Sequence, residues 1–496
     1  MASAVLLITL LAFALRLLRL DFQPLWWDEG YSVYFASQDL ATLTLKTAAD
    51  IHPPLYYYLL HVWIALFGAS DVALRLLSVV IGTATIPVFY AVGRRLVARG
   101  TALLACLLLA VSPFHVYYSQ EVRMYALATL LGLASIYFAQ RLLMDGESEA
   151  GLPSCRDLNV VRTRDLVCYV ITTALAMYTL YYAAFIPLFQ TLYALLANRR
   201  NCRRLLAWLA AQVTLAVLYL PWIALVGDIL VNYVGDKMVV EARVPLSLPT
   251  YLADHFTAFA VGQPLGAWGP LAWGSLALLA LAAWGLVANR QLRARAAWLL
   301  IWLVIPPATG FVLNLLYPFS PTGYQRFLLF CLPAYLLAAA GGITALSASA
   351  TTLARRLALP LASALLLVFT ILPLYAFYTT PRYASDDYRP LIAQVAALGQ
   401  PDDAILTVFP WQVGYLESYY PQPRPRIVEA PDALWSRDPQ RLRQDLDALT
   451  AASARLWFPA HQKHGAILEQ QVEAYLSETA YPIANDWFGD TRLYFF

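Results

Sequence analysis

The stretch Pro-Leu-Trp-Trp-Asp-Glu, residues 24–29, follows directly after an almost wholly apolar run over residues 4–20. Two adjacent carboxylates, Asp28 and Glu29, therefore stand where the chain leaves a segment suited to hydrocarbon. A carboxylate near hydrocarbon costs free energy, so its position requires a compensating role. One role is structural, because Asp is a favoured N-cap and Asp28 could cap a helix that starts at Gly30. The other role is chemistry at the lipid–water boundary, and the stretch alone leaves both open.

The composition of the chain is that of a polytopic membrane protein. Its 496 residues are 60% hydrophobic and only 13% charged, whereas charged residues make up about 25% of an ordinary soluble protein. The net charge is only +3, and the basic residues form short clusters between apolar segments. This distribution argues against a nucleic-acid partner, which would require basic residues gathered on one soluble face. It predicts contact with membrane lipids instead.

Eleven apolar segments are candidates for helices that cross a bilayer, for which roughly 20 residues are needed. They cover residues 4–20, 73–93, 101–116, 125–143, 166–180, 182–198, 205–226, 269–288, 296–317, 325–346 and 356–378. Residues 166–198 form one long apolar run, which is too long for one crossing. We divide it into two crossings at the aromatic cluster from Tyr178 to Tyr182.

The distribution of arginines tests this number of crossings, because cytoplasmic loops carry an excess of Lys and Arg. Arginine clusters follow the even-numbered segments: Arg94, Arg95 and Arg99; Arg141, Arg156, Arg162 and Arg164; Arg199, Arg200, Arg203 and Arg204; Arg290, Arg293 and Arg295; Arg355 and Arg356. With eleven crossings, all of these clusters fall on one side of the membrane. We therefore expect a cytoplasmic N-terminus and an extracytoplasmic C-terminus.

Two long loops and the C-terminal part of the chain are predicted outside the cell. The loops cover residues 21–72 and 227–268, and the second contains an amphipathic stretch, Tyr251–Phe259, which we expect along the membrane surface. We accordingly divide the chain into a transmembrane domain, 1–379, and an extracytoplasmic α/β domain, 380–496, in which strands alternate with helical periods. The predicted strands are Ala404–Phe409, Arg426–Val428, Arg455–Phe458 and either Tyr481–Ile483 or Leu493–Phe496, and helices are predicted near 386–398, 437–449 and 465–477.

The polar motifs that are suited to chemistry all map to the predicted outer side. They are Asp28-Glu29; Asp50-Ile-His52-Pro53-Pro54-Leu-Tyr56-Tyr57; Tyr118-Ser-Gln-Glu121-Val-Arg123-Met-Tyr125; and Tyr324-Gln-Arg326. Each of these residues also has a structural alternative. His52 and the prolines after it could start a helix, and Tyr56 could anchor the chain in the aromatic belt at the membrane surface. Glu121 and Arg123 could form an ion pair within their loop, Glu29 could simply be solvated, and Arg326 could extend its charged end to the membrane surface from the end of a helix.

This layout resembles the membrane glycosyltransferases of the GT-C fold, and among them the superfamily of protein O-mannosyltransferases and lipid A aminoarabinose transferases. The matching motifs, in chain order, are Trp27-Asp28-Glu29, His52-Pro53-Pro54-Leu55, Glu121-Val-Arg123-Met-Tyr125, and Tyr324-Gln-Arg326-Phe-Leu followed by Pro333. The resemblance covers roughly residues 1–380. It implies a polytopic α-helical membrane protein of the GT-C fold, with the eleven helices predicted above, in the plasma or inner membrane of a bacterial or archaeal cell envelope.

Members of this superfamily take a hexosyl or pentosyl group from a polyprenyl-phosphate carrier and pass it to an acceptor hydroxyl outside the membrane. The acceptor can be a protein, a lipid or a glycan. Carried over, the resemblance implies that Asp28 is the general base of an inverting transfer, with Glu29 and Glu121 as further catalytic candidates. It also implies that the substrate or its phosphate is bound by His52, Tyr56, Arg123, Tyr324 and Arg326. Arginine suits this role, because its guanidinium grips two phosphate oxygens.

The sequence establishes no cofactor, and the resemblance admits a divalent metal ion because some relatives carry one. The metal-ligating candidates are Asp50, His52 and His255. This chain has His52 where the aminoarabinose-transferase relatives place a lysine, so the phosphate contact at this position is an open question.

Two other function classes are alternatives to an enzyme. One is a transporter or flippase for a lipid-linked glycan, and the other is a non-catalytic membrane scaffold with an outer binding domain. Transporters place polar groups near the middle of the membrane, whereas the polar motifs of this chain cluster at the outer face. That position favours an enzyme.

Overall fold

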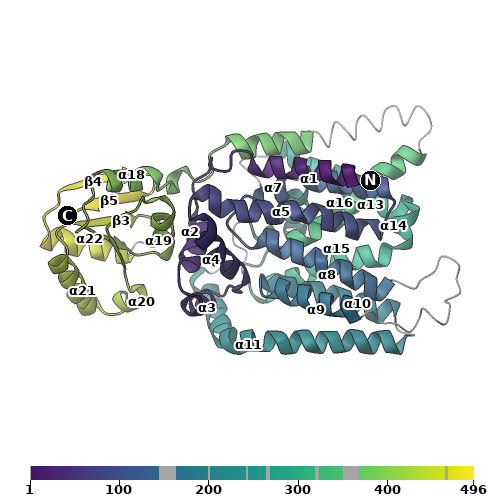
Figure 1. Cartoon of the computed structure of the whole chain (residues 1–496), viewed down its shortest axis with the longest axis horizontal. Helices are drawn as coiled ribbons and strands as arrows, with labels where there is room; N and C mark the ends of the chain where they lie inside the picture. The colour runs from purple at the N-terminus through teal and green to yellow at the C-terminus, as the bar shows by residue number, and fades with distance from the viewer. Residues whose placement is uncertain are drawn as a thin grey trace. The chain divides into compact units, whose positions relative to one another are not determined.

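The computed structural model describes most of the chain, in two compact units that are treated separately below (Figure 1). The described residues are 2–144, 163–198, 201–241, 244–263, 269–318, 323–349, 368–463 and 467–496. The helical unit comprises Met1–Leu18, Thr44–Tyr56 and Ser78–Thr380. The sheet unit comprises Arg19–Leu43, Tyr57–Leu77 and Pro381–Phe496.

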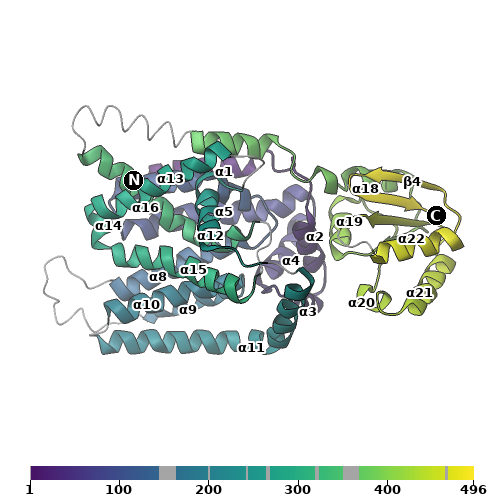
Figure 2. The same ribbon diagram turned by 180° about the vertical axis from the view of Figure 1, so that it is seen from behind.

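Long apolar helices that run roughly side by side make up most of the helical unit (Figure 1). Its elements, of which α3 and α5 begin in the sheet unit, are α1 (Ala2–Leu17), α3 (Leu40–Ala49), α5 (Asp71–Arg94), α6 (Arg99–Val111), α7 (Pro113–Tyr118), α8 (Tyr125–Met144), α9 (Thr163–Met177), η2 (Tyr181–Ala184), α10 (Phe185–Ala197), α11 (Cys202–Glu241), α12 (Leu248–Val261), α13 (Gly269–Ala288), α14 (Arg290–Ala294), α15 (Ala296–Leu316), η3 (Tyr324–Cys331), α16 (Leu332–Ser349) and a helix over 368–379. Helix α12 runs crosswise to the long helices (Figure 2), and its position along the membrane surface stays a prediction.

Most described residues of the predicted apolar segments are helical, although α1 ends at Leu17, three residues before the predicted end of its segment. The long run over 166–198 divides between α9 and η2, as predicted. Among the described residues, five helices are long and apolar enough to cross a membrane individually: Asp71–Arg94, Tyr125–Met144, Cys202–Tyr233, Ala296–Leu316 and Tyr324–Ser347. The chain is thus a membrane protein, while the eleven crossings and their orientation stay predictions.

Parts of the predicted topology lie outside the described residues. These are the first residues of the segment at 356–378 and the arginines Arg156, Arg162, Arg199, Arg200, Arg355 and Arg356. One loop boundary is wrong: α11 continues to Glu241, so residues 227–241 are helical rather than part of an outer loop. Apolar residues such as Ile229 and Val231 continue through this part of the helix.

Small residues allow two long helices of the helical unit to approach closely. A Cβ atom at Gly285 of α13 would lie 2.0 Å from the Ala338 carbonyl oxygen of α16, and one at Gly342 would lie 2.0 Å from the Leu281 carbonyl oxygen. Because lipid supplies no hydrophobic driving force between helices, close backbone packing of this kind stabilises membrane bundles.

The sheet unit contains a mixed sheet with the strand order β2-β1-β3-β5-β4 among its described residues. Strand β1 pairs in parallel with β2 and β3, and β5 pairs antiparallel with β3 and β4. The strands are β1 (Ala404–Thr407), β2 (Arg426–Glu429), β3 (Leu456–His461), β4 (Ala484–Phe488) and β5 (Thr491–Phe495), and the helices are α2 (Trp27–Ala36), α4 (Leu55–Phe67), η4 (Ala384–Asp386), α18 (Arg389–Leu398), α19 (Pro410–Tyr419), α20 (Asp432–Trp435), α21 (Pro439–Ala452) and α22 (Ile467–Thr479).

The predicted strands at 404–409, 426–428 and 455–458 correspond to β1, β2 and β3, and the last strand, β5, corresponds to the alternative at Leu493–Phe496. The predicted helices correspond to α18, α21 and α22. The sequence patterns do not predict β4, which is an exposed edge strand without an apolar run. They also do not predict α19, because its buried residues run consecutively from Trp411 to Leu416 and show no helical period.

Residues 19–43 and 57–77 pack with residues 381–496, which the predicted division of the chain at 379/380 does not anticipate. The predicted outer loop at 21–72 is largely helical, since it holds α2, α3 and α4. Glycines explain the contact between α2 and α19. A Cβ atom at Gly30 would lie 2.8 Å from the Trp411 carbonyl oxygen, and one at Gly414 would lie 2.0 Å from the Gly30 carbonyl oxygen. The two helix backbones therefore touch.

Candidate substrate site

Asp28 lies in the first turn of α2, on the sheet unit. The helix begins at Trp27 rather than Gly30, so the interpretation of Asp28 as an N-cap is wrong. The backbone N–H of Trp26 donates to Glu29 Oε2 over 3.4 Å, so Glu29 supplies the capping contact. The Asp28 side chain is partly exposed, and a carboxylate in the first turn is favoured by the helix dipole.

Glu29 is almost fully buried, with 1% of its surface exposed, and forms a two-pronged ion pair with Arg75. Arg75 Nη2 lies 2.7 Å from Glu29 Oε2, and Arg75 Nε lies 3.0 Å from Oε1. The guanidinium also donates to the carbonyl oxygens of Leu20, Gln23 and Pro24. The solvating role considered for Glu29 is therefore wrong. This pair ties the segment before Asp28 to the start of α5.

The two tryptophans beside Asp28 are held by aromatic contacts within the sheet unit. The ring of Trp26 stacks on Tyr383, with centroids 5.4 Å apart, and Trp27 stacks on Trp411 at 6.1 Å. The Leu25 N–H donates to the Tyr419 hydroxyl over 2.8 Å. Asp28 is thus presented on a rigid turn, as a group that must be positioned for chemistry requires.

On the helical unit, His52 joins two charged side chains. Arg123 Nη2 lies 3.0 Å from His52 Nε2. His52 Nδ1 lies 2.7 Å from the Asp50 carbonyl oxygen and 3.1 Å from its carboxylate. A guanidinium only donates and a carbonyl only accepts, so this arrangement assigns the imidazole proton to Nδ1 and the lone pair to Nε2.

The loop that carries Glu121 and Arg123 is fixed by buried polar contacts. Gln120 Nε2 donates to the Arg16 and Leu18 carbonyl oxygens over 2.8 and 3.0 Å. The fully buried Arg16 contacts His115 Nδ1 at 2.7 Å and Ser119 Oγ at 3.2 Å. Glu121 and Arg123 are themselves 5% and 3% exposed. A buried loop with this many polar contacts is suited to holding charged side chains in place.

Arg326 lies close to the same region from η3. Its guanidinium carbon stands 5.1 Å from the centroid of the Tyr125 ring. Burial and the nearby charge of Glu121 raise the pKa of Tyr118 well above its usual value, while the charge of Arg326 acts in the opposite direction. The Tyr118 hydroxyl therefore lies within electrostatic reach of both Glu121 and Arg326.

A glycine sets the start of η3. Gly323 has φ +77°, in the left-handed region that glycine adopts at little cost. A Cβ atom there would also lie 3.2 Å from Gln263 Nε2 and 3.4 Å from the Tyr118 hydroxyl, which accepts a 2.7 Å hydrogen bond from Gln263. This turn positions Tyr324, whose hydroxyl donates to Asp254 Oδ2 over 2.9 Å.

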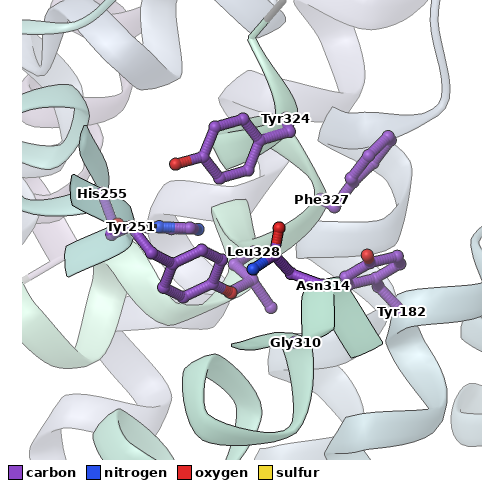
Figure 3. Close-up of a pocket in the computed structure, with 8 residues that line it drawn as sticks. All are labelled: Tyr182, Tyr251, His255, Gly310, Asn314, Tyr324, Phe327 and Leu328. Carbon is purple, nitrogen blue, oxygen red and sulfur yellow. Dashed lines mark hydrogen bonds between the residues drawn. The ribbon is translucent and has the colours of Figure 1, made fainter. Parts of the chain in front are cut away.

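A pocket opens between η2, α12, α15 and η3 of the helical unit (Figure 3). It is small, with room for about one water molecule, and is lined by Tyr182, Tyr251, His255, Gly310, Asn314, Tyr324, Phe327 and Leu328. Four of the eight lining residues are Tyr or Phe. Of the predicted site residues, Tyr324 and the metal candidate His255 belong to this lining.

The family model described as dolichyl-phosphate-mannose-protein mannosyltransferase matches residues 51–224, which include His52, Glu121 and Arg123. The crystal structure of apo ArnT from Cupriavidus metallidurans is similar over 100% of this chain and 97% of that one, with a TM-score of 0.61 and 16% identity. The chain is a glycosyltransferase of the GT-C fold.

Further solved structures share the fold of this GT-C glycosyltransferase. ArnT bound to undecaprenyl phosphate gives a TM-score of 0.59 at 16% identity, with the same coverage. The archaeal oligosaccharyltransferase AglB from Archaeoglobus fulgidus, in complex with an inhibitory peptide and a dolichol-phosphate, gives 0.53 at 12% identity over 93% of this chain and 69% of that one. No curated protein sequence matches the chain. The predicted fold class is confirmed.

The structure of the GT-C glycosyltransferase brings some predicted site residues together. His52 contacts Arg123, and Arg326 lies over the ring of Tyr125, in the motif that also carries Glu121 and Arg123. Tyr56 is fully buried and its hydroxyl lies 3.2 Å from Ser78 Oγ, which favours a packing role over substrate contact.

The predicted metal site is not assembled. Over the described part of the chain, no group of three or more His, Cys, Asp or Glu side chains is placed to hold a metal ion. Asp50 contacts His52, but His255 packs against Tyr251 and Tyr324, with ring centroids 4.3 and 5.2 Å away.

Several residues that shape the site of this glycosyltransferase are not predicted from the sequence. Arg75 could have been found from the sequence, because an arginine near the start of the apolar segment at 73–93 costs free energy unless it has a partner. Its position therefore indicates a buried ion pair or hydrogen bonds. For Asp254 and Gln263, which hydrogen-bond to Tyr324 and Tyr118 respectively, no local pattern exists. Their partners are far away in the chain.

Proposed function

We propose that this glycosyltransferase moves a sugar from a polyprenyl-phosphate-linked donor to an acceptor hydroxyl at the outer face of the cell membrane, with inversion at the anomeric carbon. The observation that carries the proposal is a pair of buried arginines in the helical unit. Arg123 is joined to His52, and Arg326 lies over the ring of Tyr125 in the same polar motif as Arg123. Solved structures of the same fold hold undecaprenyl phosphate or a dolichol-phosphate, which supports this class of donor.

In the proposed reaction, the acceptor oxygen attacks the anomeric carbon while the bond from that carbon to the phosphate oxygen breaks. The electron pair of the broken bond leaves with the polyprenyl phosphate. The acceptor proton passes to the carboxylate of Asp28, which acts as the general base. Inversion follows because a single displacement occurs from the face opposite the leaving phosphate.

Asp28 is better suited than Glu29 to act as the general base. Glu29 is held in a buried ion pair with Arg75 and its carboxylate is fully engaged. Asp28 is partly exposed at the start of the same helix, between aromatic side chains that are themselves fixed. A base needs access to the proton that it takes, and only Asp28 of the two offers it.

Arg123 and Arg326 are proposed to stabilise the charge that grows on the leaving phosphate. Buried donors stabilise developing charge more strongly than exposed ones, because water does not screen them. Both arginines are at least 90% buried. His52 presents the lone pair of Nε2 to Arg123, so its proposed role is to orient that guanidinium rather than to contact an anion itself.

The proposal is tested by donor turnover with purified protein in nanodiscs. Polyprenyl-phosphate mannose, glucose and arabinose are offered in turn, with native membrane extract as the acceptor, and the release of polyprenyl phosphate is followed. Turnover of one donor with transfer to the extract supports the proposal and names the sugar. Binding of lipid-linked sugar without turnover of any donor would favour a carrier or a scaffold.

Replacing Arg326 with Gln is expected to lower kcat about 10²–10³-fold, as the loss of one donor to a developing anion does. Arg326→Lys keeps the positive charge but loses the planar guanidinium that can donate two hydrogen bonds to a phosphate. Its kcat should therefore fall between those of the wild type and Arg326→Gln. Arg437 is exposed in the sheet unit and serves as the matched control, in which Arg437→Gln should leave kcat unchanged. Equal rates for the two Gln variants would remove Arg326 from the mechanism.

A further inference from the structure

The segment that carries Glu121 and Arg123 is held by contacts with its surroundings rather than by a helix of its own. Residues 119–124 lie between α7, which ends at Tyr118, and α8, which starts at Tyr125, and they are not helical. Their side chains are nevertheless buried, since Gln120, Glu121 and Arg123 are 7%, 5% and 3% exposed. Buried polar groups outside regular structure need partners elsewhere in the fold, and Gln120 has them.

Gln120 joins this segment to the end of α1. Its Nε2 atom donates to the carbonyl oxygens of Arg16 and Leu18, over 2.8 and 3.0 Å. Because α1 ends at Leu17, both carbonyls stand at the end of the helix, where the helix supplies no further N–H groups to pair with them. A side-chain amide has two N–H groups. Gln120 therefore uses both of them to fix residues 119–124 to α1.

The same end of α1 is fixed in turn by the fully buried side chain of Arg16. An arginine has five side-chain N–H groups. Their acceptors lie 2.7–3.4 Å away and are the carbonyl oxygens of Ala12, Leu109 and Ala110, His115 Nδ1 and Ser119 Oγ. Two of these carbonyls belong to the last turn of α6, where the helix dipole favours a cation. One guanidinium thus connects α1, α6 and the first residue of the segment.

Helix α5 limits the segment from another side. A Cβ atom at Gly82 would lie 2.2 Å from Ser119 Oγ and 3.4 Å from Arg16 Nε. A larger residue at position 82 would therefore displace Ser119 and, with it, the neighbouring Gln120. The place of residues 119–124 is set by α1 and α5 together.

We propose that Gln120 is a positioning residue, which holds Arg123 where it stabilises the negative charge on the phosphate of the lipid-linked donor. The inference rests on the proposed function, because it concerns the same phosphate. Arg123 is three residues from Gln120 and also contacts His52. Charge is stabilised by donors that are already in place, and a displacement of about 1 Å can lower a rate roughly 10²-fold.

The test is a double-mutant cycle on lipid binding, which does not require turnover. Dissociation constants for polyprenyl phosphate are measured in nanodiscs for the wild type, Gln120→Leu, Arg123→Gln and the double variant. Gln120→Leu removes both hydrogen bonds to α1, so it should weaken binding about 10-fold. In the Arg123→Gln background the same substitution should weaken binding less than about 2-fold, because the side chain that Gln120 positions is gone.

Two further variants separate positioning from folding. Gln120→His keeps one N–H donor at a similar reach, so its affinity should lie between those of the wild type and Gln120→Leu. Gly82→Ala leaves every polar group in place but displaces Ser119, and it should weaken binding as Gln120→Leu does. The matched controls are Gly227→Ala, where a Cβ atom meets nothing within 4 Å, and Gln190→Leu, which replaces a buried glutamine of α10. Both should leave the affinity unchanged.

Three results would overturn the inference. The first is a loss of affinity from Gln120→Leu that is equally large in the Arg123→Gln background, as a purely structural residue would give. The second is an unchanged affinity in Gln120→Leu, and the third is a wild type that does not bind polyprenyl phosphate.

Donor turnover is measured separately and decides the proposed function. If no donor turns over but Gln120 and Arg123 are coupled in lipid binding, the proposed function fails while the positioning role stands. If a donor turns over and the two losses of affinity multiply, only the positioning role fails.

Discussion

Asp28→Asn is expected to lower the rate of sugar transfer by about 10²–10⁴, the usual contribution of a general base. Asparagine has nearly the same shape as aspartate but cannot take the acceptor proton. Because Asp28 lies in the first turn of α2 and does not cap the helix, the substitution should leave α2 intact. The measurement is the release of polyprenyl phosphate by wild type and variant in nanodiscs, at saturating donor.

Two further variants separate chemistry from folding. Asp28→Glu restores the carboxylate in a shifted position and should recover part of the rate. Asp402 is an exposed aspartate in a turn of the sheet unit, and Asp402→Asn should leave the rate unchanged. Sugar transfer that persists in a folded Asp28→Asn protein would refute the role of Asp28. A lower melting temperature in that variant would instead place Asp28 among the residues that hold α2.

Arg75→Met is expected to destabilise the protein by about 3–5 kcal/mol, because it leaves the buried carboxylate of Glu29 without its partner. It also removes the donor to the carbonyl oxygens of Leu20, Gln23 and Pro24. The measurement is the melting temperature in detergent, with the exposed Arg437→Met as control. A melting temperature equal to that of the control would show that the ion pair contributes nothing to stability.

The double variant with Glu29→Leu and Arg75→Met tests what kind of role the pair has. Replacing a whole buried ion pair by apolar residues is often neutral or stabilising, whereas removing one partner is costly. The double variant should therefore be more stable than Arg75→Met alone. If its stability returns but its rate of transfer does not, then the pair also positions the first turn of α2 for catalysis.

The chemistry of the proposed site could be predicted only in part. Glu121, Arg123 and Arg326 stand in short polar motifs between apolar segments, and such motifs are visible without a structure because charges next to hydrocarbon are rare. The assignment of Asp28 as the base came only from the resemblance, and the sequence did not show that Glu29 is held in an ion pair. Their environments differ because Arg75, 46 residues further along, reaches only one of them.

The sequence by itself determined that this protein lies in a membrane, where most of its apolar helices run, and that a smaller region of alternating strands and helices follows them. These features depend on hydropathy and periodicity over neighbouring residues. Only the tertiary structure decided that residues 19–43 and 57–77 pack with residues 381–496, that His52 contacts Arg123, and that His255 lines an aromatic pocket. These pairings join distant parts of the chain, and they depend on close backbone contacts and on hydrogen-bond partners that no local pattern contains.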